Sequence, residues 1–277
     1  MVAIRIWNQC NNNCIMCSNY FVRNIEEDER TFTRMLSRVK EKEPCPKEIT
    51  FTGGEPFLNP SIFSLIQKFR KLYPSTEINI LSNGRIFNYL KYCSKLKKYF
   101  DNNMRIAISI LGPTPEIHDS ITLSKGSFKQ TTTGIKNLLK LKIPIELRVI
   151  VLKQNYTYLL EIAQYISDNL AGVGYIVFIF VDLVYNKEKV AISYTETSPY
   201  LIKAMQLLNK NNILFRLYHF PLCTIPQEFW KNAWISVEET KIAKTNKCKN
   251  CILAKKCVGI LKGYYSIFGD KEFKPQK

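Results

Sequence analysis

Six short apolar segments, separated by stretches of helical periodicity, constrain the fold of this chain most strongly. The predicted strands are Ala3–Trp7, Glu48–Thr52, Ile78–Ser82, Arg105–Ile110, Ile145–Leu152 and Tyr175–Phe180. Several are continuous runs rich in Ile and Val, which is typical of strands buried on both faces. The stretches between them repeat apolar residues at the spacing of one helix face. This alternation predicts a parallel α/β sheet, and six βα units predict a TIM-like (β/α)6 barrel that closes only partway.

Three helical faces stand out in the sequence. They comprise Phe32, Met35, Leu36 and Val39; Ile62, Leu65, Ile66 and Phe69; and Leu159, Ile162, Ala163, Ile166 and Leu170. In a barrel of this kind the chemistry lies at the carboxyl ends of the strands and in the loops that follow them. Functional residues are therefore expected at those positions.

The regular pattern weakens after about Asp182. A helix near Pro199–Leu208 and a strand near Ile213–Tyr218 follow, and then a tail with cysteines and little apolar periodicity. We therefore predict a barrel domain over 1–185 and a small Cys-rich domain over 186–277.

The chain is strongly basic, with a net charge of +17 from 40 Lys and Arg against 23 Asp and Glu. Such a balance suits nucleic acid, an anionic membrane surface or an acidic peptide. The positive residues are spread out, so we attribute the charge first to biased composition and rank an acidic peptide or RNA partner behind it. No apolar run approaches the roughly 20 residues of a membrane span, and no signal peptide is recognised. We expect a cytoplasmic protein with no membrane partner.

Seven of the nine cysteines fall into two groups, while Cys45 and Cys93 stand alone and are interpreted as ordinary thiols. The first group is Cys10, Cys14 and Cys17, in a polar loop directly after the first strand. Thiolates suit zinc or iron–sulfur clusters. Three thiolates on a four-iron cluster leave one iron open to a small molecule. The alternative is structural zinc with a further ligand, although zinc sites more often use paired cysteines two residues apart.

With this loop the sequence resembles the radical S-adenosylmethionine (SAM) superfamily, whose hallmark is the same cysteine spacing after strand one. The resemblance implies a [4Fe–4S] cluster on these three cysteines, with SAM chelated by the open iron. Reductive cleavage of SAM then yields methionine and a 5′-deoxyadenosyl radical, which abstracts hydrogen from a substrate. The family usually has an aromatic residue before the third cysteine. Here it is Met16, whose backbone would lie near the adenine.

The next two strand ends carry further residues of this resemblance. Gly53, Gly54 and Glu55, followed by proline, look like the Gly-Gly-Glu-Pro motif of the family. The motif implies backbone and carboxylate contacts to the SAM amino group, and glycines allow such close approach. Ser82 and Asn83 are similar to the Thr-Asn-Gly often found after the third strand, or form a plain turn.

Strands four and five supply two more candidates. By resemblance, Ser109 binds the SAM ribose or carboxylate, and Arg148 pairs with the carboxylate through its planar guanidinium. The alternatives are an ordinary strand hydroxyl and a surface charge on an edge strand. The segment from His118 to Phe128 resembles a His-Asp stretch of SAM enzymes that modify peptides and cofactors, but has Leu123 where a glycine is expected. We interpret His118 as ordering the loop rather than as catalytic.

The second cysteine group comprises Cys223, Cys248, Cys251 and Cys257. Four cysteines are the full ligand set of a closed [4Fe–4S] cluster or of a zinc site, and spacing does not decide between them. The tail from Pro221 to Gly269 resembles the auxiliary-cluster tail of radical SAM enzymes, called a twitch or SPASM-like domain. That resemblance implies one auxiliary [4Fe–4S] cluster. The stretch from Phe220 through Trp230 to Gly259 is most similar to a maturase of the His-Xaa-Ser peptide-modification system.

The resemblance as a whole implies an enzyme that abstracts hydrogen from a peptide or protein and so achieves oxidation, crosslinking or epimerisation. A flavodoxin- or ferredoxin-type protein would donate electrons. The same chemistry on a small molecule or RNA is the first alternative. A non-catalytic zinc-binding module is the alternative from another class. The sequence indicates no general base, no particular substrate and no oligomeric state.

Overall fold

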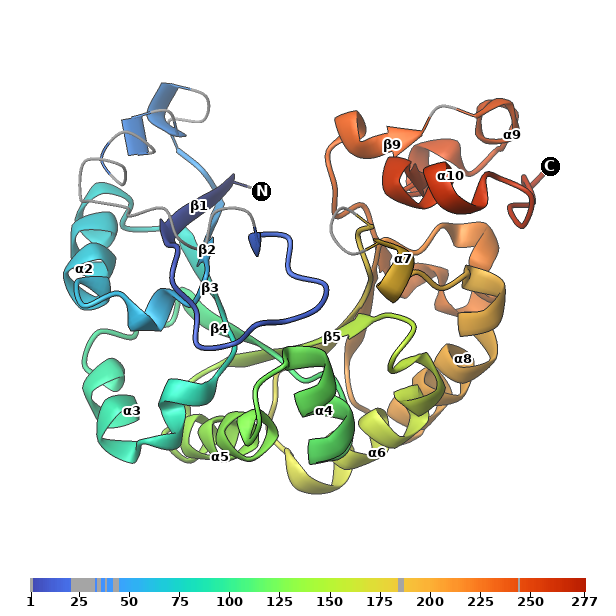
Figure 1. Ribbon diagram of the computed structural model, residues 1–277. Helices are drawn as coiled ribbons and strands as arrows, with labels where there is room; N and C mark the ends of the chain where they lie inside the picture. The colour runs from blue at the N-terminus through green and yellow to red at the C-terminus, as the bar shows by residue number, and fades with distance from the viewer. Residues whose placement is uncertain are drawn as a thin grey trace.

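The computed structural model describes residues 2–20, 33, 36–37, 39–41, 45–183, 187–243 and 245–277. Its centre is an eight-stranded sheet in which every neighbouring pair of strands is parallel. The strands follow one another in sequence order: β1 (Val2–Trp7), β2 (Glu48–Gly53), β3 (Glu77–Ser82), β4 (Met104–Ser109), β5 (Ile145–Val151), β6 (Tyr175–Phe180), β7 (Phe215–Tyr218) and β8 (Ala233–Trp234). The sheet curves into an open barrel with β1 and β8 as its edges (Figure 1).

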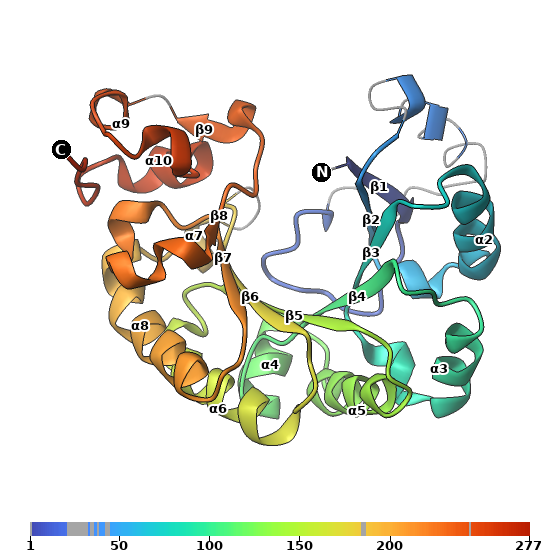
Figure 2. The ribbon, with the colours of Figure 1, turned by 180° about the vertical axis from the view of Figure 1, so that it is seen from behind.

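Helices cover the convex face of the sheet (Figures 1 and 2). The covering helices are α2 (Ile62–Leu72), α3 (Leu90–Lys97), α5 (Ser127–Lys140), α6 (Leu159–Asn169) and α8 (Tyr194–Lys210). A further helix, α4 (Pro115–Thr122), packs beside α5. Short helices in the connections are η2 (Pro56–Leu58), η3 (Arg85–Asn88), η4 (Tyr156–Tyr158), α7 (Lys187–Val190), η5 (Leu222–Thr224) and η6 (Gln227–Asn232).

Alternation along the strands produces the layers. In β4, Ile106 and Ile108 are buried in the core, whereas Arg105 and Ser109 are only partly buried on the opposite, concave face. The predicted helix faces in α2 and α6 are buried, as their periodicity requires. Of the face predicted before β2, Leu36 and Val39 are buried; its other two members lie outside the described residues.

All six predicted strands are present, but the prediction of six strands in the barrel is wrong in number. The segment predicted near Ile213–Tyr218 forms β7, which pairs with β6, and β8 then pairs with β7. The sheet therefore continues past residue 185. A strand of two residues, such as β8, is too short for alternation to reveal, and pairing between β6 and β7 depends on packing that local periodicity does not record.

Beyond β8 the chain forms a small C-terminal unit, residues 235–277. Its elements are η7 (Glu239–Lys241), β9 (Ile242–Ala243), α9 (Asn246–Lys249), η8 (Ala254–Lys256), β10 (Ile260–Leu261) and α10 (Lys262–Phe268). The buried ring of Tyr264 lies 5.8 Å from that of Phe180 and 4.7 Å from that of Tyr194, centroid to centroid. The unit thus shares the hydrophobic core of the barrel. Among the described helices, none combines the length and apolarity needed to cross a membrane.

Candidate functional site

The loop with the first three cysteines follows β1 and lies inside the curve of the sheet (Figures 1 and 2). Its start pairs with the end of β2: Gly54 N donates to Trp7 O at 2.7 Å, and Glu55 N donates to Gln9 O at 2.8 Å. A Cβ at Gly53 would lie 1.9 Å from Trp7 O, and one at Gly54 would lie 2.2 Å from Gln9 O. Both positions therefore require glycine, because any side chain would push the loop off the sheet.

Arg85, the first residue of η3, holds the tip of this loop. Its Nη1 donates to the carbonyl of Asn11 and, at 2.8 Å, to Oδ1 of Asn12. Its Nε donates to Oε1 of Gln130 on α5 at 2.7 Å. Beside it, Asn83 Nδ2 donates to Oδ1 of Asn11 at 2.6 Å. Two side chains from the segment after β3 thus hold a loop that follows β1, and α5 positions one of them.

The middle of the cysteine loop is bound to the end of α4. The backbone N–H groups of Asn13 and Ile15 donate to the carbonyls of Thr122 and Ile121 at 2.9 and 3.0 Å. Further along, Asn19 Nδ2 donates to the carbonyl of the last residue of β2 at 2.7 Å. The loop is therefore held on several sides before any cofactor is considered.

Glu55 joins the carboxyl ends of β2 and β3. It is 1% exposed, its Oε1 accepts from Ser82 Oγ at 2.8 Å and from Phe57 N at 3.1 Å, and its Oε2 accepts from Asn83 N at 2.6 Å. Burial raises the pKa of this carboxyl to about 7, although the hydrogen bonds oppose the rise. The structure brings the predicted residues Glu55, Ser82 and Asn83 together, with their side chains engaged within the protein.

The sulfur atoms of the loop lie among hydrogen-bond donors. Cys10 Sγ accepts from Asn12 N at 3.4 Å and from Asn83 Nδ2 at 3.7 Å. Cys17 N donates to the Cys14 carbonyl at 3.2 Å, so a tight turn joins these two cysteines. All three are half-buried and none forms a disulfide. N–H donors to thiolate sulfur are a feature of iron–sulfur sites, and these residues fit such a group.

A single metal ion fits these cysteines less well than a cluster. Within the described part of the chain, no three His, Cys, Asp or Glu side chains converge closely enough to hold one ion. A tetrahedral zinc site needs such convergence. A four-iron cluster instead takes one thiolate on each of several irons, so its ligands stand further apart.

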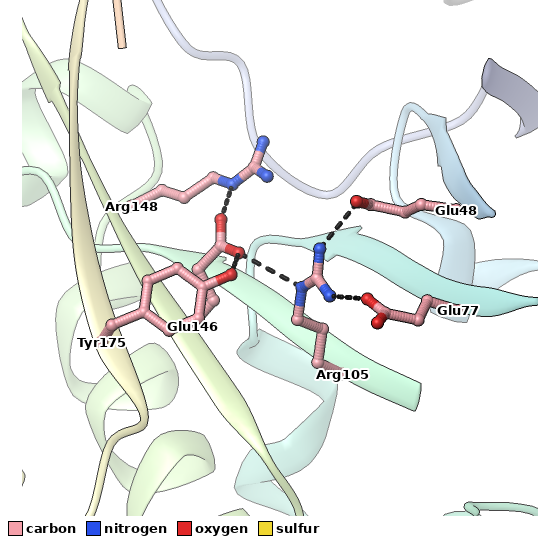
Figure 3. Close-up of polar contacts among 6 residues, drawn as sticks. All are labelled: Glu48, Glu77, Arg105, Glu146, Arg148 and Tyr175. Carbon is pink, nitrogen blue, oxygen red and sulfur yellow. Dashed lines mark hydrogen bonds and ion pairs between the residues drawn. The ribbon is translucent and has the colours of Figure 1, made fainter. Parts of the chain in front are cut away.

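Ser109 and Arg148 are register partners on β4 and β5 and so share the concave face. Arg148 Nε donates to Oε1 of Glu146 at 2.6 Å, and the terminal nitrogens of the guanidinium point away from that carboxylate (Figure 3). A hydroxyl and the outer edge of a guanidinium therefore face the concave side, an arrangement that suits a carboxylate or a sugar hydroxyl. Arg148 is not on an edge strand, because β5 lies between β4 and β6.

Below this pair, Glu146 is the centre of a polar network (Figure 3). It is 1% exposed, and its Oε2 accepts from the Tyr175 hydroxyl at 2.6 Å and lies 3.4 Å from Arg105 Nε. Arg105 also contacts Glu48 at 2.7 Å and Glu77 at 2.9 Å. A buried carboxylate is tolerated here because guanidinium groups and a hydroxyl satisfy it. The network links strands β2, β3, β4, β5 and β6 near their amino ends, at the end of the sheet opposite the cysteine loop.

His118 and Asp119 arrange the segment after β4. His118 is 1% exposed, its Nδ1 accepts from Leu111 N at 3.1 Å, and burial lowers its pKa to about 4. Asp119 accepts three hydrogen bonds from residues 126–128, at 2.6 to 2.8 Å. Leu123 has a φ of 49°, the left-handed conformation that glycine adopts readily. Leu123 thus adopts a conformation that glycine would adopt with less strain, and His118 contacts the segment that follows β4.

The second cysteine group lies apart from the first, at the C-terminal unit. One cavity of about 430 Å³ is lined by all four of its members, Cys223, Cys248, Cys251 and Cys257. Backbone donors reach two of the sulfurs: Leu222 N and Gly259 N contact Cys257 Sγ at 3.3 and 3.4 Å, and Gln276 N contacts Cys251 Sγ at 3.4 Å. Residues from the segment after β7 to the last positions of the chain thus converge on one site.

The cysteines of this cavity disfavour ionisation of one another, because neighbouring thiolates would repel. Burial raises the pKa of Cys223 and of Cys257 above the usual value, and the neighbouring cysteines raise both further. A metal centre would reverse this, because its positive charge stabilises thiolates. The donor set, the cavity and the N–H groups fit an iron–sulfur cluster with four protein ligands.

Sequence reasoning did not single out two further residues, Arg85 and His219. Arg85 binds a loop more than 70 residues away, so no local spacing reveals it. His219 follows β7 with a φ of 66°, and its Nδ1 lies 2.8 Å from the Phe180 carbonyl. A non-glycine residue with positive φ is uncommon, and at the carboxyl end of a barrel strand it is a candidate functional position. Its place after a strand is the signal that could have found it.

An open parallel α/β barrel with a three-cysteine loop at the carboxyl end of its first strand defines a radical SAM protein. The model of the radical SAM superfamily matches residues 4–166, which is more than half of the chain. The chain therefore belongs to the radical SAM superfamily. Its relatives there are enzymes, and the family implies a [4Fe–4S] cluster and SAM as cofactors.

Among curated proteins, MJ0907 of Methanocaldococcus jannaschii is 30% identical over 218 residues, which cover 76% of this chain and 70% of that protein. GTP 3′,8-cyclase of Petrotoga mobilis is 31% identical over 108 residues, covering 39% of this chain and 32% of the cyclase. The subtilosin biosynthesis protein AlbA of Bacillus subtilis is 30% identical over 121 residues, covering 42% and 25%. The matched region thus spans a third or less of GTP 3′,8-cyclase and of AlbA.

Solved structures share the fold at low sequence identity. Streptococcus suis SuiB, bound to its precursor peptide SuiA, superimposes with a TM-score of 0.60 and 13% identity, covering 83% of this chain and 50% of SuiB. The structure of anSMEcpe with bound AdoMet and a peptide gives a TM-score of 0.66 and 14% identity, covering 99% of this chain and 92% of that one. The likeness in fold therefore extends beyond residues 4–166 to the C-terminal unit.

Proposed function

We propose that this radical SAM enzyme acts on a peptide or protein, and that Cys10, Cys14 and Cys17 ligate its SAM-binding [4Fe–4S] cluster. The observation that carries the assignment is the attachment of the loop: Gly53 and Gly54 admit its backbone against β2 at distances that no other residue allows. When bound, the cluster and SAM supply a 5′-deoxyadenosyl radical that abstracts hydrogen from the substrate. The chain would supply three thiolate ligands, and SAM would bind the remaining iron.

The SAM molecule would be oriented by polar groups on the concave face. Ser109 and Arg148 supply a hydroxyl and the free edge of a guanidinium for its ribose and carboxylate. The backbone of Met16 borders the adenine in this proposal, and the backbone of Gly53 and Gly54 meets the amino group. Met16 packs against the hydrophobic core, which holds that backbone in place.

Glu55, Ser82 and Asn83 act mainly by positioning. Both oxygens of Glu55 accept hydrogen bonds from the end of β3, and Asn83 extends from there to the cysteine loop. Their loss would displace the loop and the strand ends together. A direct contact between the Glu55 carboxylate and SAM would require Glu55 to give up one of its hydrogen bonds within the protein.

The C-terminal cavity would hold a second, auxiliary [4Fe–4S] cluster on Cys223, Cys248, Cys251 and Cys257. Four protein ligands leave no open iron, so this cluster would transfer electrons rather than bind SAM. In this proposal the auxiliary domain is the C-terminal unit together with Cys223, and it lies at the end of the 186–277 stretch predicted from the sequence. Support comes from the shared cavity and from the N–H groups aimed at sulfur.

A peptide substrate is favoured by the relatives that handle peptides. SuiB and anSMEcpe have been solved with peptides bound, and AlbA serves bacteriocin biosynthesis. The net charge of +17 also suits an acidic leader sequence. Oxidation, crosslinking and epimerisation remain the candidate outcomes, and similarity to a His-Xaa-Ser maturase stays a prediction. The similarity to GTP 3′,8-cyclase supports the second candidate, the same chemistry on a small molecule.

Anaerobic reconstitution tests the metal assignments. About eight irons per chain are expected, four in each cluster. Cys14→Ala should abolish SAM cleavage, whereas Cys251→Ala should spare cleavage without substrate and stop turnover. Cys45→Ala is the matched control, since this exposed thiol lies outside both groups, and it should change neither. Stoichiometric zinc without SAM cleavage would overturn the proposal.

The substrate class is tested by deuterium transfer. A peptide encoded beside the gene, labelled with deuterium, should stimulate 5′-deoxyadenosine formation and pass its label into that product. GTP and other nucleotides serve as the competing substrates. Label transfer from a nucleotide and none from the peptide would establish the small-molecule alternative.

A further inference from the structure

Positive residues occur along the whole chain, but the net positive charge per residue is highest at its C-terminal end. Residues 241–277 contain ten lysines against two carboxylates, so these 37 residues carry a net charge of +8, while the preceding 240 carry +9. The two carboxylates are occupied within the protein. Asp270 pairs with Lys247 at 3.7 Å, and Glu272 Oε2 accepts from Thr195 N and Oγ1 at 2.8 and 2.6 Å. The segment therefore presents almost only positive charge to its surroundings.

Most of these lysines are exposed and unpaired. Lys241 contacts Asp182 at 3.7 Å. Within the described part of the chain, no carboxylate lies at ion-pair distance from the seven others that are exposed, Lys249, Lys255, Lys256, Lys262, Lys271, Lys274 and Lys277. These seven are called the lysine surface below. Unpaired like charges repel one another and destabilise the folded chain slightly, so an acidic partner would relieve them.

Three residues of the lysine surface, Lys249, Lys255 and Lys256, lie between or beside members of the second cysteine group in the chain. Lys249 lies between Cys248 and Cys251 in the chain, and η8, which contains Lys255 and Lys256, joins Cys251 to Cys257. Lys255 also lines the cysteine cavity itself. Among these lysines Ile252 is 70% exposed. An exposed apolar side chain among positive charges, close to a metal-binding site, is the composition of a weak electron-transfer interface.

The position of this surface argues for an electron carrier rather than a substrate. The C-terminal unit lies beyond β8, at the opposite edge of the sheet from β1, in both views of the molecule (Figures 1 and 2). A substrate must reach the concave face, where the loop of Cys10, Cys14 and Cys17 lies. A carrier needs only to approach the second cysteine group.

We infer that the lysine surface docks an acidic one-electron carrier protein of the flavodoxin or ferredoxin kind, which exchanges electrons with the cluster at Cys223, Cys248, Cys251 and Cys257. The inference rests on the proposed second cluster. In the exchange, the reduced carrier loses one electron and the oxidised [4Fe–4S] centre gains it, with no bond formed and no proton required. The lysines steer the approach and lower the dissociation constant, and both effects weaken as salt is added.

The test uses the protein with both clusters and an acidic flavodoxin as probe. Lys249→Glu, Lys255→Glu and Lys256→Glu are combined in one variant. Lys91→Glu, Lys97→Glu and Lys98→Glu, at exposed positions on α3 and directly after it, make the matched control, with the same change in net charge. At low salt the first variant should weaken flavodoxin binding about tenfold or more, and the control less than about twofold. A Lys→Gln version of the first variant should give a smaller loss in the same direction.

Kinetics supply the second measurement. Reduction of the clusters by flavodoxin hydroquinone should slow in the first variant by a factor similar to the loss of binding, and reduction by dithionite should not change. Equal effects of the two variants, or binding that does not depend on salt, would overturn the inference. The inference would also be overturned if the first variant lost binding of an acidic leader peptide but still bound flavodoxin. The lysine surface would then be a peptide-binding site.

Iron content separates the two proposals. A wild-type protein with about eight irons that fails to bind flavodoxin would overturn the docking surface and leave the second cluster standing. A wild-type protein with only about four irons would overturn both.

Discussion

Arg85 and Asn12 lie 73 residues apart in the chain, yet Nη1 of the arginine donates to Oδ1 of the asparagine at 2.8 Å. The same guanidinium also reaches the Asn11 carbonyl and Gln130 on α5. Through this one side chain, the segment after β3 holds the loop after β1. The fold therefore contributes to positioning the cysteine loop.

Replacing Arg85 should loosen this loop. Arg85→Met removes its hydrogen bonds and should lower 5′-deoxyadenosine formation about tenfold, with a loss of about 1–3 kcal/mol in the free energy of unfolding. Arg70→Met is the control, since Arg70 binds the carbonyls of Tyr73, Pro74 and Thr76, away from the cysteine loop. The control should lose stability but keep SAM cleavage per folded molecule. Equal losses of cleavage in the two variants would contradict a specific role for Arg85.

Gly54 should not tolerate even a methyl group. Its Cβ would lie 2.2 Å from Gln9 O, so Gly54→Ala must move the start of the cysteine loop. We expect loss of the iron bound by Cys10, Cys14 and Cys17, together with a loss of about 1–3 kcal/mol in stability. Gly126→Ala provides the comparison, because a Cβ there has open space and only the φ of 81° is unfavourable. If Gly54→Ala retains as much iron as Gly126→Ala, the close approach does not matter for cluster binding.

His118 should make the stability of the protein fall in acid. Burial lowers its pKa from the usual 6.5 to about 4 in the folded state, so the unfolded chain binds a proton first as the pH falls. Its contribution to stability is complete above about pH 6.5 and is lost progressively toward pH 4, by up to about 3 kcal/mol. His118→Asn, whose Oδ1 can accept from Leu111 N, should flatten this part of the curve of unfolding free energy against pH. An unchanged slope would show that another group causes it.

Glu146 should be the most sensitive member of the network below the site. Glu146→Gln removes the buried charge that faces the partly buried guanidinium groups of Arg105 and Arg148, and this should destabilise the fold by about 3 kcal/mol. Glu77→Gln alters a carboxylate that contacts the same Arg105 but is 57% exposed, and should change stability by less than about 1 kcal/mol. Urea unfolding of the two variants gives the comparison. Similar losses of unfolding free energy in the two variants would mean that burial of the carboxylate does not determine how much its ion pairs stabilise the fold.

Much of the barrel could be predicted because strands β1 to β6 and helices α2 and α6 carry local signals. Continuous Ile- and Val-rich runs and the spacing of one helix face are properties of short segments, and they persist when those segments pack. The strand β8 carries no such signal, since two residues show no alternation. The pairing of β7 with β6 joins segments separated by the whole of α8, and the register between them is set by packing.

By itself the sequence determined the α/β alternation, the cysteine loop after β1 and the Gly-Gly-Glu turn after β2, because each depends on neighbouring residues and their spacing. Only the tertiary structure decided that Arg85 would bind that loop, that Glu55 would face Ser82, and that Glu146 would lie between two arginines. It also brought Cys223 to the same cavity as three cysteines at least 25 residues later. These contacts join distant segments, and distant segments meet only where the register of the strands and the packing of the core bring them together.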